Sequence, residues 1–413
     1  MDRGDILIIR HTFDSGVRLV INSLPYGRSA AVGIYVRNGS RDEQLSEAGM
    51  SHFIEHMLFK GTHSRTATGI AEEMDIMGGQ LNAYTTKEYT CYYARVLNDN
   101  FEKAADILCD MYFNSKFDED DIKKEASVIV EEINMYEDTP DELVFDELQL
   151  GIWKNNNALG RPILGTAESV RSFNRADFIS YMKSHYRPDN TVVAVAGNID
   201  GERVISALEK YFGTVWETDN NYTAFQRAEY QSCDRRRHKD IEQVHLCMTY
   251  EGVPIGSKYT YDMNVLNTIL GGSMSSRLYQ SIREKYALAY SIYSYMSLYM
   301  DAGIFTVYAG VNPECEQMAR ELILKEINGI FTDRISNEDI EKAKSQIKSS
   351  YLLGLDSTIN LIEACGRNML LRNAVIESDE VVAKIDKVSR ESVYELAEMI
   401  FRDDKLSISI VGK

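Results

Sequence analysis

Two histidines and a glutamate stand close together in the segment from Gly49 to Gly61. In a helix, His52 and His56 lie about one turn apart on the same face, with Glu55 about 60° around the axis from His52. Two imidazoles at this spacing can bind one divalent ion, and a nearby carboxylate can reach a water molecule on that ion. The order H-x-x-E-H is the inverted form of the H-E-x-x-H zinc-peptidase motif. The segment therefore predicts a zinc site on a helix.

The other positions of this segment are mostly apolar, which predicts a largely buried helix: Met50, Phe53, Ile54, Met57 and Leu58. Buried imidazoles and carboxylates need partners. In the simpler alternative, the two histidines are satisfied core residues and Glu55 faces water. A third protein ligand would favour the metal site, because catalytic zinc typically takes three protein ligands and leaves the fourth position to water.

A second helix, expected over about residues 118–136, offers this third ligand. At about 100° per residue, Glu125 and Glu132 fall on one edge of its apolar stripe, whereas Glu131 lies near the opposite face. The stripe has spacings of 4, 3, 4 and 3 residues: Ile122, Ala126, Ile129, Ile133 and Tyr136. Glu132 is thus predicted to enter the site and Glu125 to support it from behind. Alternatively, all three glutamates are surface charges of an amphipathic helix.

Composition limits the class of protein. The composition, 44% hydrophobic and 26% charged, predicts a soluble globular protein. The length of 413 residues predicts two or three domains. No apolar stretch is long enough to span a membrane, and the acidic start does not resemble a secretory signal, so we expect a cytoplasmic protein. A net charge of −18 argues against nucleic acid and anionic membranes as partners. The six scattered cysteines indicate reduced thiols.

An internal repeat organises the chain. The order strand, helix, helix in residues 90–133 recurs in residues 303–351. We therefore expect an α+β fold of two similar domains, each an antiparallel sheet with helices packed on one face. Their expected bounds are 1–217 and 241–413, with a polar linker at 218–240.

The second copy lacks the candidate site. Aligning Ile122 with Ile340 places Ala343 opposite Glu125 and Ser350 opposite Glu132, and the second half has no H-x-x-E-H. Since the second copy keeps its apolar pattern without these carboxylates, the fold does not require them. This favours a chemical role for the two glutamates.

The chain resembles the pitrilysin, insulin-degrading-enzyme and mitochondrial-processing-peptidase family of zinc metallopeptidases, and in particular its short two-domain bacterial branch, similar to the processing-peptidase β subunit. The resemblance covers nearly the whole chain. It rests on a combination of motifs: H-x-x-E-H at 52–56, Glu132, Gly79-x-x-Asn82-Ala83-x-Thr85, and Arg283 followed by Tyr290.

The resemblance implies a role for each of these residues. His52, His56 and Glu132 would bind one zinc ion per chain, Glu55 would be the general base, and Glu125 would be a further carboxylate supporting catalysis. Asn82 and Ala83 would lie on an edge strand that binds an extended peptide by β-augmentation. Arg283 and Tyr290, from the second domain, would contact the scissile region and stabilise developing negative charge.

The resemblance also implies an assembly, because each short chain corresponds to half of a larger clamshell enzyme. We expect a homodimer in which each site combines the zinc ligands of one subunit with Arg283 and Tyr290 of the other. The expected activity is zinc-dependent endopeptidase cleavage of short or unfolded peptides, and the negative net charge favours basic ones.

Two alternatives remain open. The chain can be a noncatalytic scaffold or peptide-binding subunit on the same fold that needs a second subunit, or a peptide-binding protein with a structural zinc ion. A three-histidine site that includes His63 is disfavoured, because Phe53 and Thr62 occupy the positions where that pattern requires Glu and His. The sequence has no G-x-S-x-G, P-loop or G-x-G-x-x-G motif.

Overall fold

The computed structural model describes residues 7–219 and 225–413. The acidic start of the chain, residues 1–6, and residues 220–224 of the expected linker lie outside them. The chain forms two compact units, each assembled from three segments. The first unit comprises Met1–Ile133, Pro162–Phe225 and Gly354–Ile376, and the second comprises Asn134–Arg161, Gln226–Leu353 and Glu377–Lys413. Each unit thus contains a segment from the opposite half of the chain, whereas the expected domains 1–217 and 241–413 were continuous.

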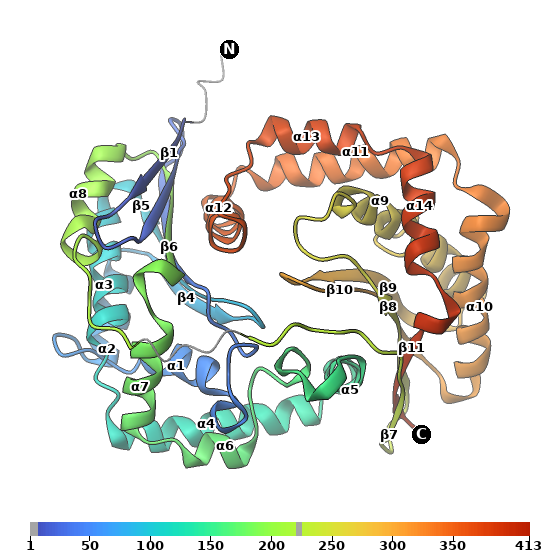
Figure 1. Cartoon of the computed structure of the whole chain (residues 1–413), viewed down its shortest axis with the longest axis horizontal. Helices are drawn as coiled ribbons and strands as arrows, with labels where there is room; N and C mark the ends of the chain where they lie inside the picture. Colours follow the sequence, from blue (N-terminus) through green and yellow to red (C-terminus); the bar gives the residue numbers. More distant parts are fainter. Residues whose placement is uncertain (1–6, 220–224) are drawn as a thin grey trace. The chain divides into compact units, whose positions relative to one another are not determined.

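The first unit is built on a six-stranded sheet with the order β1-β2-β6-β3-β5-β4 among the described residues. Its neighbouring strands are antiparallel, except that β2 and β6 are parallel. Strand β4 lies at one edge and pairs with β5. The strands are β1 (Leu7–Thr12), β2 (Arg18–Ser23), β3 (Ser29–Val36), β4 (Gln80–Thr85), β5 (Thr90–Leu97) and β6 (Thr191–Gly197). Figure 1 labels four of these strands, β1, β4, β5 and β6.

Helices cover both faces of this sheet. On one face, Val32 and Ile34 of β3 belong to a core that includes Phe53 of α1. On the other face, Ala31 and Tyr35 pack in a second core with α12 (Thr358–Arg372). The helices of the first face are α1 (Met50–Leu58), α2 (Ala67–Ile76), α3 (Phe101–Asn114), α4 (Glu119–Glu137), α6 (Ala167–Ser172), α7 (Arg175–His185) and α8 (Gly201–Phe212). The structure therefore adds a helix to the face that the sequence left uncovered.

Glycine permits the close approach of α12 to the sheet. A Cβ atom at Gly366 would lie 2.4 Å from Cε2 of Tyr35, so a larger residue would force the helix away. Tyr35 is 1% exposed. Because β3 is covered on both faces, seven of its eight residues are buried.

The second unit repeats this plan with a five-stranded sheet, β7-β11-β8-β10-β9, among the described residues. Its strands are β7 (Asp234–His238), β8 (Val244–Glu251), β9 (Ala289–Leu298), β10 (Gly303–Val311) and β11 (Ser407–Gly412). One face carries α9 (Thr260–Leu270), α10 (Glu316–Gly329), α11 (Asn337–Gly354) and α14 (Arg390–Ile400). Helix α13 (Ser378–Asp386) packs against α9. The other face carries α5 (Pro140–Ile152), which comes from the first half of the chain.

Part of the expected linker 218–240 is regular structure. Residues 234–238 form β7, which pairs in parallel with β11. The arginines of this strand form ion pairs, Arg235 with Glu147, Arg236 with Glu316 and Arg237 with Glu137. This basic run therefore protects a sheet edge with charge.

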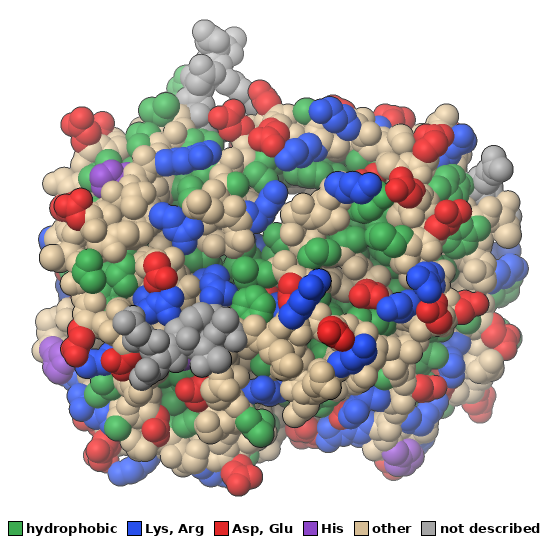
Figure 2. All heavy atoms as spheres, in the orientation of Figure 1, with side chains coloured by type: hydrophobic (Ala, Val, Ile, Leu, Met, Phe, Trp, Pro, Cys, Tyr) green, Lys and Arg blue, Asp and Glu red, His purple; other side chains and the backbone are tan. Residues whose placement is uncertain are grey.

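The repeat predicted from the sequence is present as β5, α3 and α4 in the chain order of the first half and as β10, α10 and α11 in the second. Acidic and basic side chains of the described residues are interspersed over the face shown in Figure 2. Within residues 7–219 and 225–413, each helix is too short or too polar to cross a membrane.

Candidate metal centre

Helix α1 presents the H-x-x-E-H residues because its remaining surface is anchored in the core. Phe53, Ile54 and Leu58 are fully buried and hold one face of the helix. The helix begins after Gly49, whose φ of +93° suits glycine. The carboxylate of Glu43 accepts hydrogen bonds of 2.8 Å from the N–H groups of Gly49 and Ser51, so it caps the helix N-terminus.

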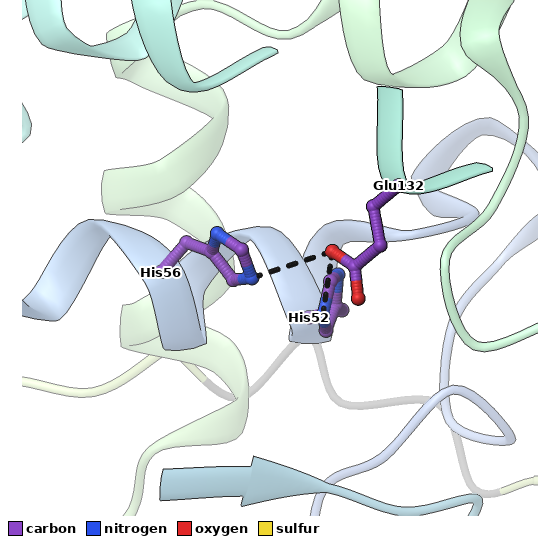
Figure 3. Close-up of side chains that lie close together, drawn as sticks. All are labelled: His52, His56 and Glu132. Atoms are coloured by element: carbon purple, nitrogen blue, oxygen red, sulfur yellow. Dashed lines mark ion pairs between the residues drawn. The ribbon is translucent and has the colours of Figure 1, made fainter. Parts of the chain in front are cut away.

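His52, His56 and Glu132 converge at one point. Figure 3 shows the two imidazoles on α1 and the carboxylate arriving from α4. Oε2 of Glu132 lies 3.8 Å from Nε2 of His52 and 3.7 Å from Nε2 of His56. One ligand atom from each of the three residues lies within 4.8 Å of the others. Ligands bound to one zinc at about 2.0–2.2 Å are separated by roughly 3.3–3.6 Å in tetrahedral geometry, so this donor set fits the ion.

The protonation state of His52 also suits a metal. Burial, together with the neighbouring His56, lowers the pKa of His52 to about 3, so this ring is neutral near pH 7. Neutral imidazole is the form that binds zinc. Burial opposes protonation of His56, but the hydrogen bond and charge of Glu125 raise its pKa, so a bound metal would displace a proton from that ring. Burial raises the pKa of Glu132, because the ionised carboxylate is poorly solvated there. A bound cation would stabilise the ionised form.

Glu125 supports His56 from behind. Its Oε1 lies 2.9 Å from Nδ1 of His56, and its Oε2 lies 2.6 Å from Nζ of Lys60. Burial opposes ionisation of this carboxyl, but the hydrogen bonds of His56 and Lys60 hold its pKa below the usual range. A carboxylate at Nδ1 keeps the proton on that nitrogen and leaves Nε2 free for a metal. Sequence reasoning missed Lys60, although it follows His56 by one helical turn.

Glu55 lies beside this group on α1. The Oγ1 hydroxyl of Thr85 donates a hydrogen bond of 2.5 Å to Oε2 of Glu55. Burial raises the pKa of Glu55, while the hydrogen bond of Thr85 limits the rise. A carboxylate with a raised pKa is suited to accept and return a proton near neutral pH.

Asn82 and Ala83 lie on the edge strand β4, as expected from the sequence. Asn82 is exposed, and its Oδ1 accepts a hydrogen bond of 2.9 Å from the N–H of Ala83. Strand β4 also carries Thr85, so the contact with Glu55 comes from the same edge of the sheet. The candidate metal group and a strand at the edge of the sheet therefore belong to one unit.

Arg283 and Tyr290 are neighbours in the second unit. Arg283 lies in a π-helical segment, Tyr279–Lys285, and Tyr290 lies on β9. The guanidinium is 5.7 Å from the centre of the Tyr290 ring and 4.9 Å from that of Tyr279. Tyr290 is 78% exposed, so its hydroxyl is accessible. His63, by contrast, is an exposed loop residue outside the metal group.

Comparisons with known proteins are consistent with this geometry. The family description "Insulinase (Peptidase family M16)" matches residues 18–167, and "Peptidase M16 inactive domain" matches residues 172–347. The chain is 43% identical over 398 residues to the uncharacterized zinc protease YmxG of Bacillus subtilis, with 96% of this chain and 97% of that protein covered. An uncharacterized zinc protease of Rickettsia felis is 37% identical over 399 residues, with 96% of each chain covered.

Solved structures share the fold. A protease from Helicobacter pylori matches with a TM-score of 0.91 at 19% identity, covering 99% of this chain and 100% of that chain. A peptidase M16 inactive domain from Pseudomonas fluorescens matches with a TM-score of 0.90 at 15% identity, covering 98% of each.

Proposed function

Because the chain belongs to the insulinase family of peptidases, family M16, we propose that it is a zinc-dependent endopeptidase acting on extended segments of short or unfolded peptides. The observation that carries this proposal is the convergence of His52, His56 and Glu132, with Glu55 beside them. A noncatalytic subunit would have no need of a proton-accepting carboxylate next to a complete set of zinc ligands.

Each residue of the site has a defined task in this proposal. Zinc held by His52, His56 and Glu132 would supply a Lewis acid that activates water and polarises the peptide carbonyl. Glu125 fixes the tautomer and orientation of His56. Glu55 takes a proton from the attacking water and returns it to the leaving amine.

The substrate would bind as an added strand on β4. Main-chain hydrogen bonds at Asn82 and Ala83 would supply affinity with little selection for sequence. The negative net charge favours basic peptides over neutral ones. Equal kcat/KM values for a matched series of neutral and basic peptides would contradict this preference.

We further propose a homodimer with composite sites, in which Arg283 and Tyr290 of one subunit stabilise the negative charge that develops at the zinc site of the other. Mixing inactive E55Q protein with inactive R283A protein would then restore activity after subunit exchange, because each mixed dimer contains one intact site. A mixture that stays inactive would argue against the composite site.

The decisive experiment measures hydrolysis of a mixed library of unstructured peptides by purified protein. E55Q protein and chelator-treated wild type run beside it, and zinc is then returned to the treated sample. The proposal expects turnover that disappears in both controls and returns with zinc. Zinc binding at one ion per chain without any cleavage would instead support the noncatalytic scaffold or peptide-binding subunit.

A further inference from the structure

Thr85 joins the peptide-binding edge to the general base. It is the last residue of β4, and its hydroxyl donates the 2.5 Å hydrogen bond to Oε2 of Glu55. We propose that Thr85 is a positioning residue that holds the Glu55 carboxylate in a fixed place relative to a peptide on β4. This inference rests on the proposed function and deepens it.

The end of β4 is held rigidly by a buried loop, residues 38–43. The N–H of Ser40 donates to the carbonyl oxygen of Thr86 at 3.2 Å, and the N–H of Arg41 donates to that of Lys87 at 2.8 Å. The guanidinium of Arg41 forms a 2.6 Å ion pair with Glu88, and the two side chains are only 1% and 6% exposed. The turn that follows Thr85 therefore cannot shift without breaking buried polar contacts.

The same loop fixes the start of α1. Glu43 caps the helix through the N–H groups of Gly49 and Ser51, and Nδ2 of Asn38 lies 3.3 Å from Oγ of Ser51. Loop 38–43 thus anchors both the helix that carries Glu55 and the turn that follows Thr85. The hydrogen bond between Thr85 and Glu55 is made between two pre-positioned elements.

This arrangement orients a flexible side chain. A glutamate has three rotatable bonds, and a donor at one carboxylate oxygen selects one orientation and leaves the other oxygen to accept a proton. A misplacement of a reacting group by about 1 Å can lower a rate by about a hundredfold. Thr85 is therefore expected to affect the chemical step more than peptide binding.

The test compares kcat, KM and bound zinc for T85V, T85S and wild-type protein. Valine keeps the shape of threonine without its hydroxyl, so T85V is expected to lower kcat by about tenfold or more. KM should stay within about twofold, because the main chain of β4 is unchanged. T85S keeps the donor and should recover most of kcat. T68V is the matched control, since Thr68 is exposed on α2 and has no side-chain hydrogen bond among the described contacts.

Each outcome decides the inference. A low kcat for T85V with unchanged KM and zinc content, restored in T85S, supports it. Four results would overturn it and leave the proposed function intact. T85V could keep the wild-type kcat, raise KM in place of lowering kcat, or lose zinc, or T85S could fail to recover kcat. A wild-type protein that cleaves no peptide overturns the proposed function, and this inference with it.

Discussion

Helices α4 and α11 hold the same place in the repeated order of elements but have different chemistry. Ile122 of α4 and Ile340 of α11 are both buried, at 4% and 3% exposure. Three residues later, α4 has Glu125 at 6% exposure, whereas α11 has Ala343 at 2%. The same buried position therefore holds a carboxylate in one unit and a methyl group in the other.

This difference separates stability from function. Burying a carboxylate costs free energy unless it is paired, and a small apolar residue avoids that cost. The second unit has the apolar Ala343 at this position, so the fold does not require a carboxylate there. In the first unit, Glu125 is retained with two partners, His56 and Lys60. The carboxylate is best explained by what it does for His56.

The largest expected effect comes from removing the third of the proposed zinc ligands. E132A should weaken zinc binding by more than the roughly 10- to 100-fold typical of losing an outer partner, because it removes one of three protein donors. Peptide hydrolysis should disappear. Zinc titration and peptide cleavage measure both effects. S350A at the equivalent, exposed position of α11 is the matched control and should behave as wild type.

The opposite substitution tests the second unit. A343E would place an unpaired carboxylate in the α11 core and should lower the free energy of unfolding by roughly 3 kcal/mol or more. The two tryptophans allow each unit to be read separately, since Trp153 lies in the second unit and Trp216 in the first. In a W216F background, Trp153 fluorescence during urea unfolding reports the loss.

S350E is the control for A343E, because the new charge faces water and should change the free energy of unfolding by less than about 0.5 kcal/mol. If A343E had the same free energy of unfolding as the W216F parent, a carboxylate at this position would cost no stability in α11. Stability would then not explain why α11 has alanine where α4 has glutamate. The retention of Glu125 would then need no functional explanation.

Helical periodicity was sufficient to predict which glutamates of α4 face α1. The expected helix over 118–136 is α4, Glu119–Glu137. Glu125 contacts His56 and Glu132 meets both histidines, whereas Glu131 is exposed. The rotation of about 100° per residue is a local property of every α-helix, so the face on which each glutamate lies can be predicted from the sequence alone.

The segment exchange could not be predicted in the same way. The apolar residues of α5 and α12 show that each helix is buried, but periodicity does not say which sheet covers it. Strand β7 was missed because its side chains are charged and lack the apolar alternation of a half-buried strand. Thr85 stood inside a recognised motif, but its contact with Glu55 depends on how β4 and α1 pack.

A smaller effect is expected from Glu125 itself. E125A should weaken zinc binding by about 10- to 100-fold and lower activity, because His56 loses the partner that fixes its tautomer. E131A, on the exposed face of the same helix, should leave zinc binding unchanged. Competition with a chelator of known affinity measures the difference. Equal affinities for E125A and E131A would show that the buried carboxylate does not act through His56.

The last prediction is a difference in acid sensitivity between the units. Burial lowers the pKa of His185 in the first unit to about 4, and the side chain stacks on Tyr181. The unfolded chain, with a histidine pKa near 6.5, therefore takes up a proton first as the pH falls. Stability contributed by neutral His185 is present above about pH 6.5 and is lost towards pH 4, by up to about 3 kcal/mol.

Single-tryptophan proteins separate this effect from general acid unfolding. Trp216 donates a 2.8 Å hydrogen bond to the carbonyl oxygen of Tyr186, next to His185, so W153F protein reports the first unit. In the second unit, burial also lowers the pKa of His245, but that residue is only half-buried and Asp141 opposes the shift. Between pH 6.5 and pH 5, the free energy of unfolding measured with urea should fall more for the first unit than for the second. The H185Q substitution should make this fall smaller. An H185Q protein with the full wild-type pH dependence would assign the acid sensitivity of the first unit to other groups, among them His52, whose pKa burial also lowers.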